Sequence, residues 1–332
     1  MTFLPTAEER EFQEALRGFL AKEHDLDSVR RLADATTEQR AEVTRSVRDF
    51  GVFEWVHEAG ARALALTARE AGRALLASPV VEDALWGVLV HRLVPGLPWE
   101  VEAACSGAVR VSGIFGELKA GRLIVGLPGV QFLLRVIPEG SVIEVFEVGA
   151  DAFGAVACLD GSLSLGEVAT QLTQPVWRAE GVASEAHFVK ALWYLLLSAQ
   201  VIGAAERCVE LFQSHGTARR QFGVPIAGFQ AVQQQAAAHF AKLSAASALC
   251  SFAEWCAMHD RDQVERVALS SWEYTSRIAR PLAESMVQIH GGIGFTWEYD
   301  LHLFFRRIIA LDSLHRLAPE EEHRIMDATP LW

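Results

Sequence analysis

The sequence contains no paired-cysteine motif. Its five cysteines, at positions 105, 158, 208, 250 and 256, stand singly and form no Cys-x-x-Cys. An odd number of scattered cysteines argues against a disulfide framework and against a zinc site. Unpaired thiols are also typical of a reducing compartment, and we therefore expect a cytoplasmic protein.

Positive charge is scarce as well. The 332 residues include 30 Lys and Arg against 42 Asp and Glu, which gives a net charge of −12. A nucleic-acid partner would require a basic face, and this composition disfavours one. The opening "MTFLPTAEEREFQEALRGFL" is acidic and amphipathic, so it does not read as a secretory signal.

Long apolar runs are missing too. The longest, "ALWYLLLSAQVIGAA" at 191–205, is too short to cross a bilayer and is interrupted by Gln200. We interpret it as a buried helix and expect no membrane association. Because its apolar residues extend beyond one stripe, it also suggests a large buried subunit interface.

The order of patterns along the chain predicts three domains. Residues 1–99 are mainly helical, with a capping box formed by Thr6 and Glu9 at the start of an amphipathic helix. Residues 100–180 hold short Val-, Ile- and Phe-rich runs separated by glycine, which indicates a small β domain. Residues 181–332 return to helix, with four long segments at 185–215, 227–258, 262–289 and 297–316. Short connections between these segments favour a four-helix bundle, so the fold class is α+β, mainly α.

Two stretches in the bundle have residues suited to binding an anion. In the first, Arg219 offers a planar guanidinium for a phosphate, Gln221 adds a donor and an acceptor, and Phe222 offers a flat face for an aromatic base. In the second, Gly291 and Gly292 would let backbone amides approach an anion closely. Each stretch taken alone is equally compatible with an ordinary helix end.

Together the two stretches resemble the acyl-CoA dehydrogenase family. The pattern is Arg-x-Gln-Phe-Gly, then Phe-Gln at a helix start, then Gln-x-x-Gly-Gly-x-Gly. The α–β–α order of the chain resembles the family as well. The resemblance implies an FAD-dependent enzyme, usually tetrameric, in which these segments hold the pyrophosphate and adenosine half of an FAD whose ring sits on the neighbouring subunit. The residues carried over are Arg219, Gln221, Phe222, Gln230, Gln288, Gly291 and Gly292.

Other family features are absent from this sequence. No Thr-Glu-Pro-x-x-Gly-Ser-Asp-like loop and no Trp-x-Thr/Ser segment, which hold the flavin ring in the family, occur in 100–175. Counting without gaps from the shared motifs, the two usual positions of the family's catalytic glutamate fall at His315 and Trp193. We therefore assign no catalytic residue and expect His315 to be an exposed histidine near the tail.

Other polar residues offer weaker alternatives for a base. Glu206 and Glu210 are expected on a polar or subunit-facing side of the first bundle helix. Asp300 and His302 could pair, although an Asp before a helix is an ordinary cap. The acidic run at 320–323 is most simply a solvated tail.

The resemblance implies a subunit of a heteromeric bacterial acyl-CoA dehydrogenase that has lost the base and completes the FAD clamp of a homologous catalytic subunit, with a heterotetramer expected. The substrate would be an acyl-CoA thioester, such as one with a bulky sterol side chain, in fatty acid or steroid catabolism. Two alternatives stay open: a self-sufficient homo-oligomeric enzyme with a displaced base, and a non-catalytic acyl-CoA- or partner-binding protein.

Overall fold

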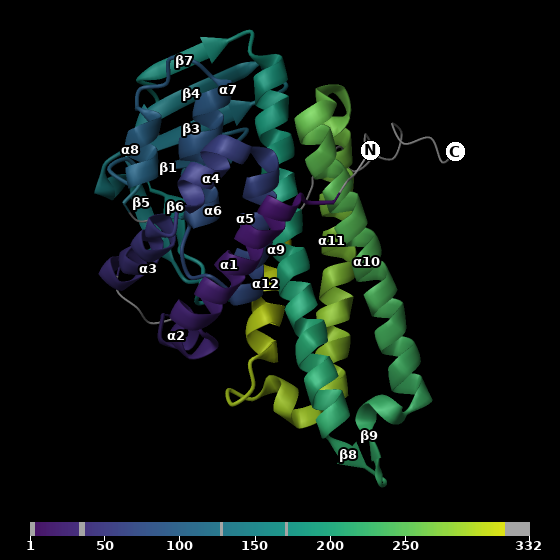
Figure 1. The fold of residues 1–332 in the computed structure, drawn as a ribbon. Coiled ribbons are helices and arrows are strands. Elements are labelled where there is room, and N and C mark those ends of the chain that lie inside the picture. The colour runs from purple at the N-terminus through teal and green to yellow at the C-terminus, as the bar shows by residue number, and fades with distance from the viewer. Residues whose placement is uncertain (1–3, 33–36, 127–128, 170–171, 316–332) are drawn as a thin grey trace.

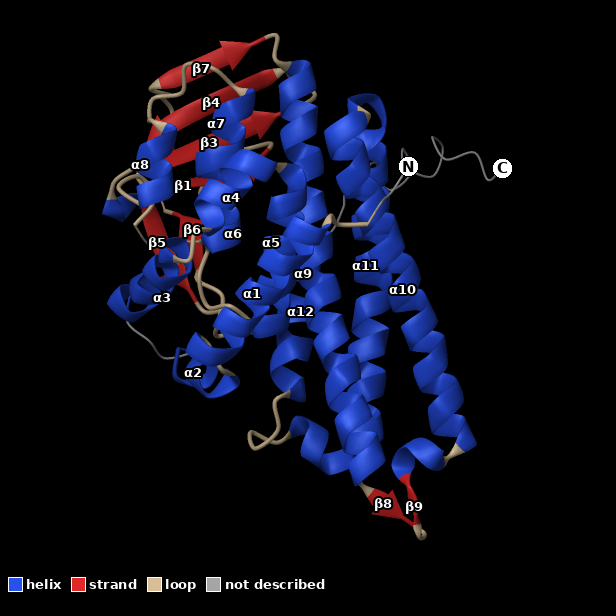
Figure 2. Cartoon of the chain, in the orientation of Figure 1, coloured by secondary structure: helices blue, strands red, loops and turns tan. Residues whose placement is uncertain are grey.

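The computed structural model describes residues 4–32, 37–126, 129–169 and 172–315. The strands between residues 111 and 180 gather in one part of the molecule, the long helices of the C-terminal part run down its other side, and a short two-stranded hairpin lies at the far end of those helices (Figure 1; Figure 2). The α+β, mainly α fold with a C-terminal helical bundle is confirmed. The domain boundaries at 99/100 and 180/181 stay a prediction, and the acidic run at 320–323 lies outside the described residues.

Helices dominate the N-terminal part. The elements are α1 (Ala7–Glu23), α2 (Leu26–Leu32), α3 (Thr37–Asp49), α4 (Val52–Ala59), α5 (Ala61–Ala74), α6 (Val80–Asp83), the π-helical η1 (Ala84–Leu89), α7 (Val90–Leu93) and α8 (Val101–Ser106). The predicted capping box starts α1: the Glu9 amide donates to Thr6 Oγ1 at 3.2 Å, and the Thr6 amide donates to Glu9 Oε2 at 2.7 Å.

Two small sheets make up the β region. Its elements are β1 (Val111–Phe115), β2 (Leu123–Val125), β3 (Phe132–Ile137), β4 (Val142–Glu147), η2 (Ala150–Ala152), β5 (Phe153–Val156), β6 (Leu165–Val168) and β7 (Trp177–Glu180). One sheet has the order β1-β3-β4-β7, with β1 and β3 parallel and the other pairs antiparallel. The second, β2-β6-β5, is antiparallel throughout.

The bundle helices match the predicted segments to within a few residues. They are α9 (Ala183–Ala218), α10 (Gln230–His259), α11 (Arg261–His290) and α12 (Leu301–His315), with β8 (Arg220–Gln221), β9 (Val224–Pro225), η3 (Ile226–Gly228) and η4 (Gly291–Phe295) in the connections. By length and composition α9 could cross a membrane, but 94% of its most apolar window is buried. The run at 191–205 is therefore a core helix, and it gives no support for a subunit interface.

Helix α9 contacts α5 at close range. A Cβ atom placed on Gly203 of α9 would lie 2.0 Å from the carbonyl oxygen of Arg69, and one on Gly72 of α5 would lie 2.0 Å from that of Gln200. Only glycine fits at such a distance between two backbones. The crossing fixes the N-terminal helices onto the bundle.

Replacing Gly203 by Ala should therefore push α5 and α9 apart and lower the free energy of unfolding by about 1–3 kcal/mol, the usual cost of overpacking. Gly18→Ala is the matched control, because nothing lies within 4 Å of a Cβ at this exposed position in α1. There, alanine should raise stability by roughly 0.5–1 kcal/mol. Urea denaturation measures both, and equal effects at the two sites would contradict the close crossing.

Candidate functional site

The first predicted stretch forms a β-hairpin at the end of α9 (Figure 1). Arg220 pairs with Pro225 and Gln221 with Val224, so Phe222 and Gly223 form a two-residue turn. Their φ angles are 49° and 83°, as a type I′ turn requires. A phenylalanine is unusual in this left-handed conformation. Its ring is 95% exposed, so the strained turn presents an aromatic face to solvent.

Arg219 lies between α9 and the hairpin. Its amide donates to His215 O at 2.8 Å, and its carbonyl accepts from the Ile226 amide at 2.8 Å, so the backbone is fixed on both sides. The side chain is exposed, and among the described residues no carboxylate lies within ion-pair distance of it. A fixed, unneutralised guanidinium at the surface can bind a phosphate.

The second predicted stretch closes the end of α11. Gly291 has a φ of 68°, and nothing lies within 4 Å of a Cβ placed on Gly291 or Gly292. This open backbone is what a closely approaching anion requires. The rings of His215 on α9 and His290 on α11 are stacked with centroids 4.4 Å apart, so the two stretches lie at the same end of the bundle.

All seven residues predicted to hold the cofactor are exposed. Their chemistry fits the pyrophosphate and adenosine half of FAD, because they combine an unneutralised arginine, an exposed aromatic ring, amides and an accessible glycine backbone. Their role stays a prediction. We call these residues the clamp: Arg219, Gln221, Phe222, Gln230, Gln288, Gly291 and Gly292.

Trp193 and His315, the two positions that counting along the sequence assigns to the family's base, lie together at a place separate from the clamp. Trp193 of α9 and His315, the last residue of α12, contact each other edge to face, with ring centroids 5.1 Å apart. Trp86 of η1 and Phe115 of β1 lie 5.6 and 6.4 Å from Trp193, so four rings from four elements form one cluster. A Cβ on Gly113 would lie 2.4 Å from the Trp86 ring, and this glycine lets the indole lie against β1.

The aromatic cluster borders a pocket of about 340 Å³ between the β region and the bundle. Its only charged lining residues are Lys119 and Arg122, and no carboxylate lines it among the described residues. General-base removal of a carbon-bound proton requires a basic group within reach. By counting along the sequence, Trp193 and His315 fall at the positions of the family's glutamate, and this correspondence stays a prediction.

His315 is not the exposed histidine that the sequence suggested. The residue is half-buried against Trp193, and its Nε2 is enclosed without a hydrogen-bond partner among the described residues. Its carbonyl accepts from Trp272 Nε1 at 2.9 Å, which ties the end of α12 to α11. Burial lowers the pKa of His315 from 6.5 to about 3, so the imidazole is neutral and a weak base near pH 7.

Glu206 and Glu210 lie on a polar side of α9, as the sequence suggested, and this side faces α5. Arg73 of α5 pairs with Glu206 at 3.3 Å and with Glu210 at 2.6 Å, and Arg69 also pairs with Glu206. Arg73 Nε also lies 3.6 Å from Glu70. These carboxylates are neutralised within the chain and do not serve the clamp or the base position.

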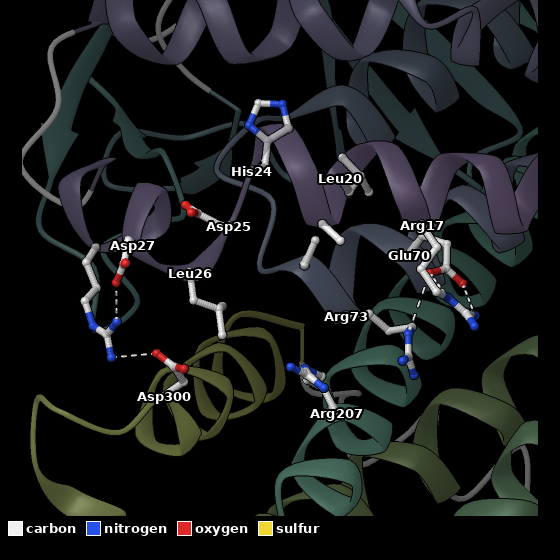
Figure 3. Close-up of a pocket in the computed structure, with 13 residues that line it drawn as sticks. Arg17, Leu20, His24, Asp25, Leu26, Asp27, Glu70, Arg73, Arg207 and Asp300 are labelled. Atoms are coloured by element: carbon white, nitrogen blue, oxygen red, sulfur yellow. Dashed lines mark hydrogen bonds and ion pairs between the residues drawn. The ribbon is translucent and has the colours of Figure 1, made fainter.

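A pocket of about 450 Å³ lies between α1, α2, α5, α9 and α12 (Figure 3). On one side of it Arg17 donates to Glu70 at 2.7 and 2.9 Å, and on the other Arg30 bridges Asp27 and Asp300. Because each guanidinium has a carboxylate partner, the pocket has little excess charge to hold an ion.

Asp300 and His302 do not pair with each other. Asp300 pairs with Arg30 of α2 at 2.5 Å, whereas Nδ1 of His302 lies 2.8 Å from the Tyr299 carbonyl oxygen. The short spacing in the sequence suggested a pair, but α2 supplies a cation for the carboxylate. Asp300 therefore links α2 to the start of α12, whereas His302 makes a local contact, and the two residues form no acid–base pair.

The buried His315 should make the protein sensitive to acid. Below pH 6.5 the unfolded chain takes up a proton at this histidine that the folded chain does not bind until about pH 3. Acidification through this range therefore favours the unfolded state. His315→Gln should show a smaller loss of stability between these two pH values. Urea unfolding as a function of pH measures it, and identical pH profiles for the variant and the native chain would contradict the burial of a neutral imidazole.

Comparison with known proteins agrees with the fold and the motifs. The family model described as "Acyl-CoA dehydrogenase, C-terminal domain" matches residues 195–312. The chain is 36% identical over 152 residues to acyl-CoA dehydrogenase IpdE2 of Mycobacterium tuberculosis. That alignment covers 46% of this chain and 44% of IpdE2, so less than half of this curated relative is matched.

Two solved structures have similar folds over nearly their whole length. The ChsE4–ChsE5 complex from Mycobacterium tuberculosis gives a TM-score of 0.79 at 18% identity, covering 99% of this chain and 100% of the matched chain. A variant of the Tcur3481–Tcur3483 steroid ACAD gives 0.77 at 18% identity, covering 96% and 97%. By the family model, residues 195–312 form an acyl-CoA dehydrogenase C-terminal domain, and the chain as a whole has the fold of these solved structures.

Proposed function

We propose that this chain is the base-lacking subunit of a heteromeric, FAD-dependent acyl-CoA dehydrogenase. The observation that carries the proposal is the contact between Trp193 and His315. By ungapped counting, the two usual positions of the family's base fall on these aromatic and neutral side chains, and no described residue lining the adjacent pocket is a carboxylate. A subunit built this way needs a homologous partner that supplies the base, and we propose a heterotetramer in the cytoplasm.

The clamp is what this chain contributes. Arg219 would hold the FAD pyrophosphate, and the pyrophosphate could come close to the open backbone at Gly291 and Gly292. Phe222 would face the adenosine. All of these groups are exposed and form one side of a site, so the flavin ring would lie on the partner. Bound FAD supplies the hydride acceptor for α,β-desaturation, and the partner's glutamate takes the α-proton.

The substrate we propose is an acyl-CoA thioester carrying a bulky, steroid-derived group. The support is likeness: one of the solved structures of the same fold is a steroid ACAD. Within this chain the pocket beside Trp193 is bordered by the aromatic cluster, so the acyl group would bind on the partner's side of the complex.

Replacement of Arg219 tests the clamp. In complexes with the partner chain, Arg219→Ala removes a charge-assisted, bidentate contact of roughly 1.5–3 kcal/mol, so FAD affinity should fall by about 10- to 100-fold. Arg219→Lys should also be impaired, because an ammonium cannot reproduce the planar fork. Arg220→Ala is the control, since Arg220 Nη1 donates to Gly223 O at 3.3 Å within the hairpin.

Flavin retained per complex after gel filtration measures all three variants. Full retention in Arg219→Ala would contradict the clamp. A yellow, active assembly of this chain alone would favour the self-sufficient enzyme instead, and a flavin-free assembly that binds acyl-CoA would favour a binding protein.

His315→Ala tests whether this chain supplies a base. Desaturation by the complex should stay within a fewfold of the native rate, because a buried imidazole with a pKa near 3 is a poor proton acceptor. Loss of a general base costs about 100-fold or more. A drop of that size in kcat, with flavin content intact, would identify His315 as the base and overturn the proposed division of roles.

A further inference from the structure

The two halves of the clamp lie on different helices. Arg219 follows α9, whereas Gly291 and Gly292 follow α11. A dinucleotide held by both halves is bound well only if the helix ends keep a fixed spacing. Contacts between the ends of α9 and α11 must therefore matter for binding, even where they do not touch the cofactor.

Three side chains occupy the space between these helix ends. His215 lies one turn before Arg219, and its carbonyl accepts the Arg219 amide at 2.8 Å. Its ring is stacked on His290, which directly precedes Gly291, with centroids 4.4 Å apart and an interplanar angle of 24°. Tyr299 packs against both rings, with centroids 4.9 Å from His290 and 5.9 Å from His215.

The Tyr299 hydroxyl lies between the two helices. It is 3.1 Å from His290 Nε2 on α11 and 3.2 Å from the Leu211 carbonyl oxygen on α9. The other ring nitrogen of His290, Nδ1, lies 2.7 Å from the Met286 carbonyl oxygen. His290 is only 6% exposed, so these contacts are shielded from water.

The hydrogen atoms in this network can be assigned. A carbonyl oxygen only accepts, so Nδ1 of His290 must carry a hydrogen and donate it to Met286. Burial lowers the pKa of His290, which favours the neutral ring. Nε2 is then an acceptor, and Tyr299 must donate to it. The same hydroxyl also donates to the Leu211 carbonyl oxygen at 3.2 Å, so its one hydrogen is shared between His290 on α11 and Leu211 on α9.

We propose that Tyr299 and His290 are positioning residues whose hydrogen bond fixes the spacing of the two clamp halves and thereby sets flavin affinity. This inference rests on the proposed function. Neither side chain needs to touch the cofactor. Their effect reaches it through the stacked His215 and the backbone bond from His215 to Arg219 on one side, and through Gly291 on the other.

Tyr299→Phe in the full complex tests the inference. The ring and its packing stay, while Nε2 of the buried His290 loses its donor. FAD affinity should fall by about 3- to 10-fold, less than for Arg219→Ala, because the lost bond lies outside the cofactor contacts. Tyr274→Phe is the matched control, because it makes the same substitution at a tyrosine within α11. This variant should retain native FAD affinity. Thermal unfolding of the flavin-free complexes checks that both variants fold.

A pH series separates positioning from a general structural defect. Without the tyrosine donor the pKa of His290 rises, and on acidification its Nε2–H can donate to Leu211 O, which restores a link between the helices. The stacked His215 opposes this protonation, and the neighbouring charges are Arg219, which acts on His215, and Arg207 and Asp300, which act on Tyr299. The deficit of Tyr299→Phe relative to the native complex should therefore shrink as the pH falls.

The outcomes distinguish the two proposals. If Arg219→Ala releases flavin but Tyr299→Phe behaves like Tyr274→Phe, the positioning role is wrong and the clamp stands. A Tyr299→Phe deficit that is independent of pH would overturn the hydrogen-bond assignment on which the role depends. If Arg219→Ala retains its flavin, the clamp and this inference both fail.

Discussion

The close crossing of α5 and α9 is the constraint on which the rest of the structure depends. Two glycines, Gly72 and Gly203, let the backbones of these helices touch, and any larger residue would separate them. At this distance the arginines of α5 meet the carboxylates of α9 in ion pairs. The same crossing brings η1 against the upper part of α9, where Trp86 reaches Trp193 and the aromatic cluster forms.

This arrangement gives the two ends of α9 different properties. Near the β region, aromatic rings and a neutral histidine lie together beside a pocket that no carboxylate of the described residues lines. At the far end the helix leads into an exposed hairpin with an unneutralised arginine. The first feature leaves this place without a group suited to proton abstraction. The second provides groups that can bind a dinucleotide from one side. Such a combination suits a subunit that completes a partner's site.

Sequence reasoning predicted the features that local pattern determines. The bundle helices are long and well separated by turn residues, so their predicted bounds lie within a few residues of the observed ones. The capping box of α1 depends only on two residues three positions apart. Strands β6 and β7 lack the Val-, Ile- and Phe-rich pattern that predicts the β region, because β6 contains a glycine and a glutamate and β7 is a polar edge strand. The partners of Glu206 and the burial of His315 depend on helices far away in sequence, which no local pattern reveals. The clamp residues are those that the family resemblance implies, whereas the position of Tyr299 between α9 and α11 is known only from the structure.

The most direct test of this account removes the base from the partner instead of from this chain. In the assembled complex, the catalytic glutamate of the partner is replaced by Gln, and desaturation of its acyl-CoA is measured together with flavin content. The account predicts that flavin stays bound while the rate falls by at least about 100-fold, because this chain offers no replacement base. Desaturation that continues near the native rate would place a working base in this chain and contradict the proposal that this chain lacks one.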